Sequence, residues 1–123
     1  MRTLLIVDDE DGVRSLVRMT LDSDNYKILE ASDGSEALTV ARESHPDLVL
    51  LDVMLPDLSG IEICRELKRD PAMGSTSIVM LTAKAQQTDL GEAEDAGADG
   101  YFTKPFSPIA LMQKVESILG PPE

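Results

Sequence analysis

Four short apolar segments of this sequence are each followed immediately by a residue of a kind that binds phosphate or metal ions. Two of these positions carry carboxylates, the third a hydroxyl and the fourth an ammonium: Asp8-Asp9, Asp52, Thr82 and Lys104. For any one of them, a surface side chain without a function is the simpler explanation. Surface residues without a function would fall at both ends of such segments, however. Because all four positions follow the end of an apolar segment, we predict that they form a single site.

The charges of these residues favour a divalent cation. Three carboxylates and one ammonium sum to a formal charge of −2, and acids at close range resist joint ionisation unless a cation joins them. The available ligand atoms are oxygens, which suits Mg²⁺ or Mn²⁺ rather than zinc. Lys104 would add a point charge and Thr82 a hydroxyl for phosphoryl oxygens. A carboxylate such as Asp52 can also act as a nucleophile toward phosphorus.

The elements that must position these residues alternate between strand and helix. Apolar runs predict strands at five places: 3–7, 27–31, 46–52, 77–81 and 101–103. Apolar periodicity or capping residues predict a helix after each strand. Asp33 and Ser107 are expected N-caps, Gly97 opens an expected C-cap and turn, and 72–76 is expected to be a loop. The weakest predicted helix, at 89–96, contains Gly91 and has acids near its end. Strict alternation predicts an α/β fold with a single doubly wound five-stranded parallel sheet. We expect the strand order 2-1-3-4-5, which spacing does not fix.

Length and composition restrict the class of protein. The chain of 123 residues suits one domain, to which we assign 1–119, with 120–123 as a tail or the start of a linker. The net charge of −12 argues against direct binding to nucleic acid or an anionic membrane. A single cysteine excludes an internal disulfide and a thiolate metal cage. The N-terminal apolar run is too short for a signal peptide or a membrane span, and the predicted location is the cytoplasm.

Two residues with reactive side chains are assigned no functional role. His45 precedes the central strand and therefore lies at the opposite edge of the sheet from Asp52, where a solvated loop residue is expected. Cys64 lies in the predicted helix that begins after Ser59, among apolar residues, and is predicted to be a buried core residue.

The four motifs together resemble those of the receiver domain of two-component response regulators, the family of the chemotaxis response regulator. The matching segments are VDDE at 7–10, LLDVMLP at 50–56, MLTAK at 80–84 and GADGYFTKPF at 97–106. Each motif alone is weak, but the set in this order is highly specific, and it covers essentially the whole chain. The resemblance implies the flavodoxin-like (βα)5 fold. It also implies a phosphorelay signalling protein that catalyses only its own phosphorylation and dephosphorylation.

The resemblance implies roles for the acidic residues. Asp52 would be the phosphoacceptor for a phosphohistidine on a sensor histidine kinase or a histidine phosphotransfer protein. Asp9 and Asp52 would ligate Mg²⁺ directly, together with the main-chain carbonyl of Met54, and Mn²⁺ is the alternative ion. Asp8 would act mainly through water.

The resemblance also implies a signal output. Lys104 would contact the phosphoryl group, and its bond to Pro105 would be cis. Thr82 and Tyr101 would form a conformational switch, because a hydroxyl drawn toward the phosphoryl group would vacate space for the ring. The output surface would comprise the fourth helix, the fifth strand and the fifth helix, and would act on a downstream protein target or a fused output domain. The last helix lacks a basic end, which favours a stand-alone protein or a non-DNA-binding output.

Other classes of protein with a similar fold or chemistry fit the sequence less well. A haloacid-dehalogenase-like Mg²⁺-dependent phosphatase needs a second aspartate two residues after the first, where this chain has Met54. A flavodoxin-like carrier needs rings to flank its flavin, and the chain has no Trp, two Tyr and two Phe. A nucleotide-binding domain would need a Gly-rich loop after the first strand, which this sequence lacks.

Overall fold

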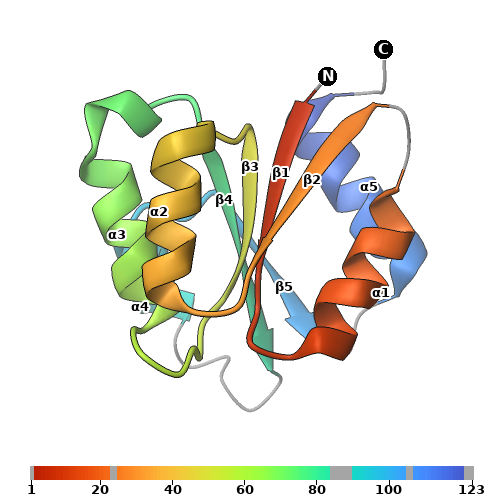
Figure 1. Ribbon diagram of the computed structural model, residues 1–123, viewed down its shortest axis with the longest axis horizontal. Helices are drawn as coiled ribbons and strands as arrows, with labels where there is room; N and C mark the ends of the chain where they lie inside the picture. Colours follow the sequence, from red (N-terminus) through yellow and green to blue (C-terminus); the bar gives the residue numbers. More distant parts are fainter. Residues whose placement is uncertain (1, 23–24, 84–89, 105–106, 121–123) are drawn as a thin grey trace.

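The computed structural model describes residues 2–22, 25–83, 90–104 and 107–120, and it places a sheet between two layers of helices (Figure 1). The strands are β1 (Arg2–Val7), β2 (Tyr26–Ala31), β3 (Leu48–Asp52), β4 (Ser77–Ala83) and β5 (Gly100–Lys104). The helices are α1 (Asp11–Leu21), α2 (Gly34–Ser44), α3 (Gly60–Arg69), α4 (Leu90–Asp95) and α5 (Pro108–Leu119), with a short 3₁₀ turn, η1 (Pro71–Met73). Strands and helices therefore alternate as the sequence predicts.

The strands form one parallel sheet in the order β2-β1-β3-β4-β5. The predicted fold class and strand order are thus confirmed. The register places Asp52 opposite Leu81, and Thr82 opposite Thr103. Because the strands all point the same way, their carboxyl ends meet at the lower edge of the sheet in Figure 1.

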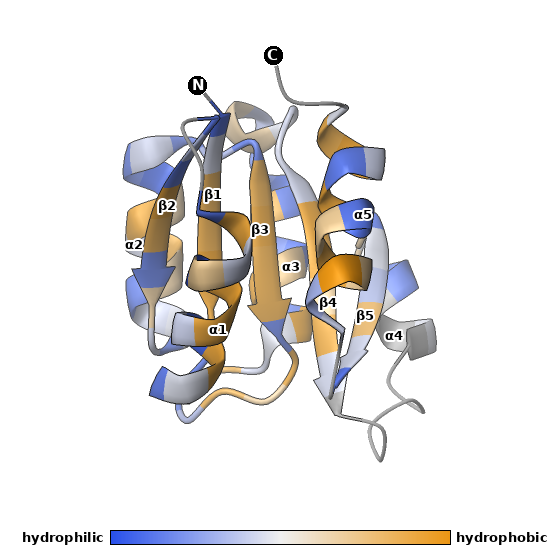
Figure 2. Ribbon diagram, turned by 90° about the vertical axis from the view of Figure 1, so that its right-hand side faces the viewer, coloured by the Kyte–Doolittle hydropathy of each residue, from blue (hydrophilic) through white to orange (hydrophobic). Residues whose placement is uncertain are grey.

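Two apolar cores lie on the two faces of the sheet. Helices α1 and α5 cover one face, and α2, α3 and α4 cover the other (Figure 1). Strand β3 is buried along its whole length, and Figure 2 shows it as a continuous apolar ribbon that turns polar at its end. Successive side chains of a strand point to opposite faces. The single run therefore supplies both cores, with Leu48 and Leu50 toward α1 and α5, and Val49 and Leu51 toward α2 and α3.

Short-range signals set most of the helix boundaries. The carboxylate of Asp33 accepts a hydrogen bond from the N–H of Glu36 and caps α2, as the sequence predicts. The hydroxyl of Ser107 caps α5 in the same way. Gly97 follows α4 with a φ of +97°, a left-handed conformation that glycine adopts at little cost. These predictions hold because a cap depends on neighbours along the chain.

Several element boundaries differ from the sequence-based expectation: β3 begins at Leu48 rather than at 46, and β4 continues to Ala83 rather than ending at 81. Helix α4 covers Leu90–Asp95, while Asp89, where we expect it to begin, lies outside the described residues. The turn η1 occupies part of a segment that the sequence predicts as loop, because Asp70 accepts a hydrogen bond from the N–H of Ala72 and Pro71 supplies a suitable φ. Among the described residues, no helix has both the length and the apolar character needed to cross a membrane.

Candidate functional site at the carboxyl edge of the sheet

Three charged side chains from different strands meet at the carboxyl edge of the sheet. Asp8 follows β1, Asp52 ends β3 and Lys104 ends β5. The ammonium nitrogen of Lys104 lies 2.5 Å from Oδ2 of Asp8 and 3.5 Å from Oδ2 of Asp52. The long, flexible stem of a lysine allows this reach from β5 past β4. The structure thus brings together three of the predicted site residues, and the lysine bonds more closely to Asp8 than to Asp52.

Asp52 is a buried carboxylate with 5% of its surface exposed. Burial, followed by the negative charge of Asp8, raises the pKa of Asp52 from 3.8 to about 6. The charge of Lys104 and the N–H of Met54, which donates to Oδ1 of Asp52 at 3.3 Å, partly oppose this increase in pKa. Asp52 is therefore mostly ionised at neutral pH but poorly solvated, a combination that is typical of functional carboxylates.

Lys104 balances the negative charge at this edge. Burial alone would lower the pKa of its ammonium, but the hydrogen bond to Asp8 and the charges of Asp52 and Asp8 outweigh burial and raise the pKa. Lys104 consequently stays protonated at physiological pH. Its bond to Pro105, for which the resemblance implies a cis form, lies outside the described residues.

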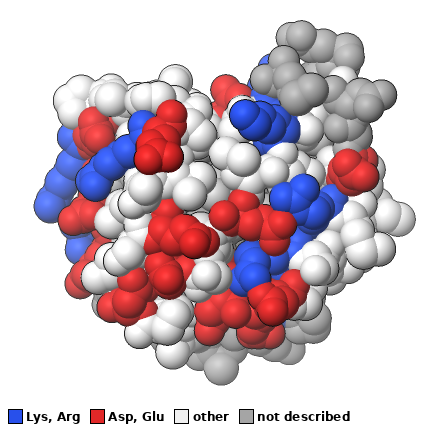
Figure 3. Space-filling view, in the orientation of Figure 1, with Lys and Arg blue, Asp and Glu red and all other residues white. Residues whose placement is uncertain are grey.

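The loop after β1 supplies a group of three carboxylates. Oxygens of Asp8, Asp9 and Glu10 lie within 4.8 Å of one another. Asp8 is buried, whereas Asp9 and Glu10 are exposed. Figure 3 shows acidic side chains gathered toward the lower part of the face that it draws, the part at which the strands end. An all-oxygen group in such a field fits a hard divalent cation such as Mg²⁺. Asp52 lies outside this group and is linked to Asp8 through Lys104.

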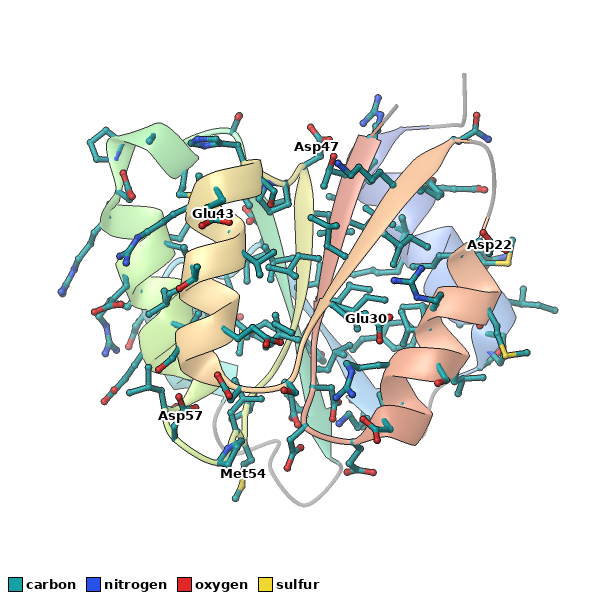
Figure 4. All side chains as sticks on the ribbon, viewed as in Figure 1. Asp22, Glu30, Glu43, Asp47, Met54 and Asp57 are labelled. Carbon is teal, nitrogen blue, oxygen red and sulfur yellow. The ribbon has the colours of Figure 1, made fainter. Side chains whose placement is uncertain are left out.

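Arg14 of α1 fixes the start of this acidic loop. Its guanidinium donates to the main-chain carbonyl of Asp8 at 2.6 Å and to the carboxylate of Glu30 at 3.2 Å, and it also pairs with Asp11. Glu30 extends from β2 toward α1 (Figure 4) and accepts a second bond from Arg18 at 2.7 Å. The planar guanidinium can hold several acceptors at once, so Arg14 ties the end of β1 to β2 and α1.

The loop after β3 closes on itself beside Asp52. Met54 and Ser59 form an antiparallel bridge, and the N–H of Gly60 donates to the carbonyl of Val53 at 2.8 Å. A Cβ at Gly60 would lie 2.0 Å from the main-chain oxygen of Asp52, so only glycine fits at this close approach. The main chain of Met54 is consequently held next to the carboxylate of Asp52.

The two predicted switch residues lie on one face of the sheet. Thr82 is fully buried, and its hydroxyl has no hydrogen-bond partner within the described part of the chain. A buried hydroxyl without a partner costs free energy, so it marks a place that a further acceptor would satisfy. Tyr101 pairs with Met80, two residues before Thr82, and therefore shares its face. The ring of Tyr101 is half exposed, at 48%.

Sequence reasoning misses the side chains that support this site. Arg14 bonds a main-chain carbonyl, and its only signal is a basic residue one turn into the helix that follows the acidic loop, which is common on helices. Glu10 adjoins Asp8 and Asp9 in sequence, and this adjacency is a signal that could identify it. Asp57 bonds a helix that begins 23 residues earlier and leaves no local signal.

Relatives of known class match nearly the whole chain. The response regulator receiver domain matches residues 4–116. The alkaline phosphatase synthesis transcriptional regulatory protein PhoP of Bacillus subtilis is 44% identical over 118 residues, which cover 96% of this chain and 48% of that protein. The phosphate regulon transcriptional regulatory protein PhoB of Pseudomonas aeruginosa is 43% identical over 118 residues, 96% of this chain and 52% of that protein. The chain thus spans about half the length of these relatives.

The fold has a close counterpart among solved structures. A chemotaxis response regulator of Vibrio cholerae has a TM-score of 0.89 and 31% identity, with 96% of this chain and 98% of that chain covered. The charged strand ends, the sheet order and the sequence matches lead to the same assignment. The chain belongs to the response regulator receiver domain family of two-component signalling.

Proposed function

We propose that Asp52 accepts a phosphoryl group from a phosphohistidine on a sensor histidine kinase or a histidine phosphotransfer protein. The observation that carries this proposal is a buried carboxylate at the end of the central strand with the ammonium of Lys104 3.5 Å away. The carboxylate can supply an oxygen nucleophile, and the ammonium can offset charge on the incoming group. Membership of the receiver family supports the same role.

The transfer needs no further reactant apart from a proton of the solvent. An oxygen of Asp52 forms the new P–O bond while the P–N bond to the donor imidazole breaks, and the imidazole nitrogen keeps the electron pair and takes up a proton from water. With a pKa of about 6, Asp52 is mostly ionised at neutral pH and needs no base to activate it. Lys104 and the hydroxyl of Thr82, which has no partner among the described residues, would donate to phosphoryl oxygens. Catalysis then consists mainly of positioning and charge stabilisation.

We assign the metal site to Asp8, Asp9, Asp52 and the main-chain carbonyl of Met54. These donors fit Mg²⁺, with Mn²⁺ as the alternative, because all are oxygens and two of the acids already lie within 4.8 Å of each other. When bound, the ion would offset the negative charge that gathers as a phosphoryl group approaches the carboxylates.

The proposed output is a change at Thr82 and Tyr101. A phosphoryl group at Asp52 would offer the hydroxyl of Thr82 the acceptor that it lacks in the described structure. Movement of that hydroxyl toward Asp52 would free space on the face that Tyr101 shares. A contact made in only one state is what shifts a two-state equilibrium. The surface that responds would comprise α4, β5 and α5.

Transcription control is the output that the relatives favour. PhoP and PhoB are named as transcriptional regulatory proteins, whereas the sequence-based preference for a stand-alone or non-DNA-binding output rests only on the lack of basic residues at the end of α5. We therefore propose an output domain or partner protein that acts on transcription. With a net charge of −12, this chain itself should not bind DNA, and a gel-shift assay on the isolated chain tests that expectation.

The phosphoacceptor assignment is tested by intact-protein mass after incubation with a small acyl phosphate. One phosphoryl adduct is expected with Mg²⁺ or Mn²⁺ and none with a chelator. Asp52→Asn should abolish the adduct, whereas Asp22→Asn, which alters an exposed carboxylate at the far end of α1, should not. Labelling of Asp52→Asn at the parental rate would refute the assignment.

The switch is tested by amide hydrogen exchange with and without a phosphoryl mimic at Asp52. Exchange should change in β4 near Thr82 and in β5 near Tyr101, as well as in the loops at the site. A change confined to the loops at Asp9 and Asp52 would rule the switch out.

A further inference from the structure

Asp57, in the loop after β3, bonds to the N-terminus of α2 (Figure 4). One carboxylate oxygen accepts from the N–H of Gly34 at 2.7 Å and from the N–H of Leu58 at 2.9 Å. The other accepts from the N–H and the hydroxyl of Ser35, each at 3.0 Å. The bond from Gly34 is the main reason that the pKa of Asp57 falls to about 2. These four bonds hold an otherwise exposed side chain in one orientation.

Close packing accompanies these hydrogen bonds. Gly34 is buried, and a Cβ built on it would lie 2.8 Å from Cβ of Leu58 and 2.9 Å from Cδ1 of Ile63. Both distances are shorter than such carbon atoms tolerate. The first turn of α2 and the loop therefore touch directly, with no room for even one methyl group between them.

The loop that Asp57 anchors also carries the main chain beside Asp52. Its two ends are joined by the bridge between Met54 and Ser59, and the N–H of Met54 donates to Oδ1 of Asp52 at 3.3 Å. Helix α2 has a cap of its own in Asp33, which accepts from the N–H of Glu36 at 2.8 Å. Asp57 is thus an additional cap for α2, and it is the only one of the two that also fixes the loop.

We infer that Asp57 is a positioning residue for the site at Asp52: by fastening the loop to α2, it holds the main chain of Met54 where it bonds Asp52 and where its carbonyl would meet the metal ion. The inference rests on the proposed function of Asp52. It extends the supports of the site to α2, whereas the bonds to the carboxylate of Asp52 in the described part of the chain come from Met54 and Lys104. Groups that orient metal ligands from behind commonly change metal affinity 10–100-fold when removed.

The structure offers a matched pair of variants to test this inference, Asp57→Ala and Asp33→Ala. Each removes one carboxylate from the N-terminus of α2, so each changes the net charge by the same amount and leaves N–H groups of the same helix without a cap. Only Asp57→Ala frees the loop after β3. Urea unfolding measures the shared effect on stability. Calorimetric titration with MgCl₂ and amide exchange in metal-free protein measure the effect on the site.

Both variants should lower the urea midpoint. Asp57→Ala should raise the dissociation constant for Mg²⁺ about 10-fold and speed amide exchange at Met54 and Ser59, whereas Asp33→Ala should keep the parental values of both. Asp57→Asn keeps one acceptor oxygen and should give an intermediate affinity. If Asp57→Ala fails to fold, Asp57→Asn and Ser35→Ala, which removes one of the four bonds, carry the same comparison.

The outcomes separate two kinds of failure. Equal Mg²⁺ affinity and equal exchange at Met54 in Asp57→Ala and Asp33→Ala would overturn the positioning role while leaving the proposed function intact. A parent protein that binds no Mg²⁺ and takes no phosphoryl group from an acyl phosphate would refute the proposed function itself, before any variant is compared.

Discussion

The loop after β3 and the segment from α4 to β5 both serve the proposed signalling function, but they are held very differently. The loop is closed by a bridge between Met54 and Ser59 and tied to α2 by Asp57. Helix α4 has six residues, contacts α3, and is followed by a turn to which a side chain of α3 bonds. There the thiol of Cys64 lies 3.8 Å from the carbonyl of Ala96.

This difference between the two regions corresponds to their two proposed roles, phosphoryl transfer beside Asp52 and signal output at α4 and β5. Phosphoryl transfer depends on fixed geometry, because small displacements of reacting groups cost rate. A switch needs an element whose alternative positions differ by little free energy, and such elements come from the weakly packed parts of a fold. On the proposed function, the receiver combines a loop that is bonded at both ends beside Asp52 with a short helix at the output surface.

Glycine substitutions should separate the two regions most strongly. Gly60→Ala should lower the free energy of unfolding by about 3 kcal/mol or more, because its Cβ would meet the main-chain oxygen of Asp52 at 2.0 Å. Gly91→Ala in α4 has nothing within 4 Å and should leave stability unchanged or raise it by about 0.5–1 kcal/mol. Urea unfolding of both variants measures the contrast, and equal losses of stability would contradict it.

Asp52→Asn should stabilise the metal-free protein at neutral pH. The pKa of Asp52 is raised from 3.8 to about 6, so the folded state binds its proton more tightly than the unfolded state does. The contribution of Asp52 to stability is therefore fully present below about pH 4 and is lost as the pH rises through about 6. This loss lowers the free energy of unfolding by up to about 3 kcal/mol. Urea unfolding in chelator at pH 4 and pH 7 should show the advantage of Asp52→Asn only at the higher pH. An advantage of equal size at both pH values would contradict this cause.

Asp9→Ala should remove the stabilisation by Mg²⁺ without harming the metal-free fold. Mg²⁺ at ten times its dissociation constant should stabilise the parent by about 1.4 kcal/mol through mass action. Because Asp9 is exposed and lies in an acidic loop, its loss should leave the metal-free protein at least as stable. Thermal melts with and without MgCl₂ measure both effects, and an undiminished response in the variant would count against the assigned ligands.

Lys68→Met should loosen the residues after α4 and spare the site. The ammonium of Lys68 lies 2.7 Å from the carboxylate of Asp99 and donates to the carbonyl of Thr76 at 2.9 Å. Its removal should cost about 1 kcal/mol, with faster amide exchange at Ala98 to Gly100. The affinity for Mg²⁺ should stay at its parental value. A loss of that affinity would show that the two regions are not held independently.

The sequence by itself determined the framework of this protein. Buried strands appear as continuous apolar runs, and caps such as Asp33 and Ser107 act on neighbours within a few residues, so both are visible along the chain. In a parallel sheet, residues that directly follow the strands must lie at the same edge, so their positions in the sequence also predict where they lie in space. That rule brought Asp8, Asp52 and Lys104 together, as predicted. Their roles in phosphoryl transfer and metal binding stay predictions.

Only the tertiary structure decided which partner each side chain takes. Lys104 bonds Asp8 more closely than Asp52, because the two carboxylates compete for one ammonium and a difference of 1 Å depends on packing. Arg14 bonds a main-chain carbonyl, and Asp57 bonds main-chain N–H groups of a helix 23 residues earlier. Main-chain donors and acceptors are the same in every residue, so no pattern of side chains reveals which of them a distant carboxylate or guanidinium will meet.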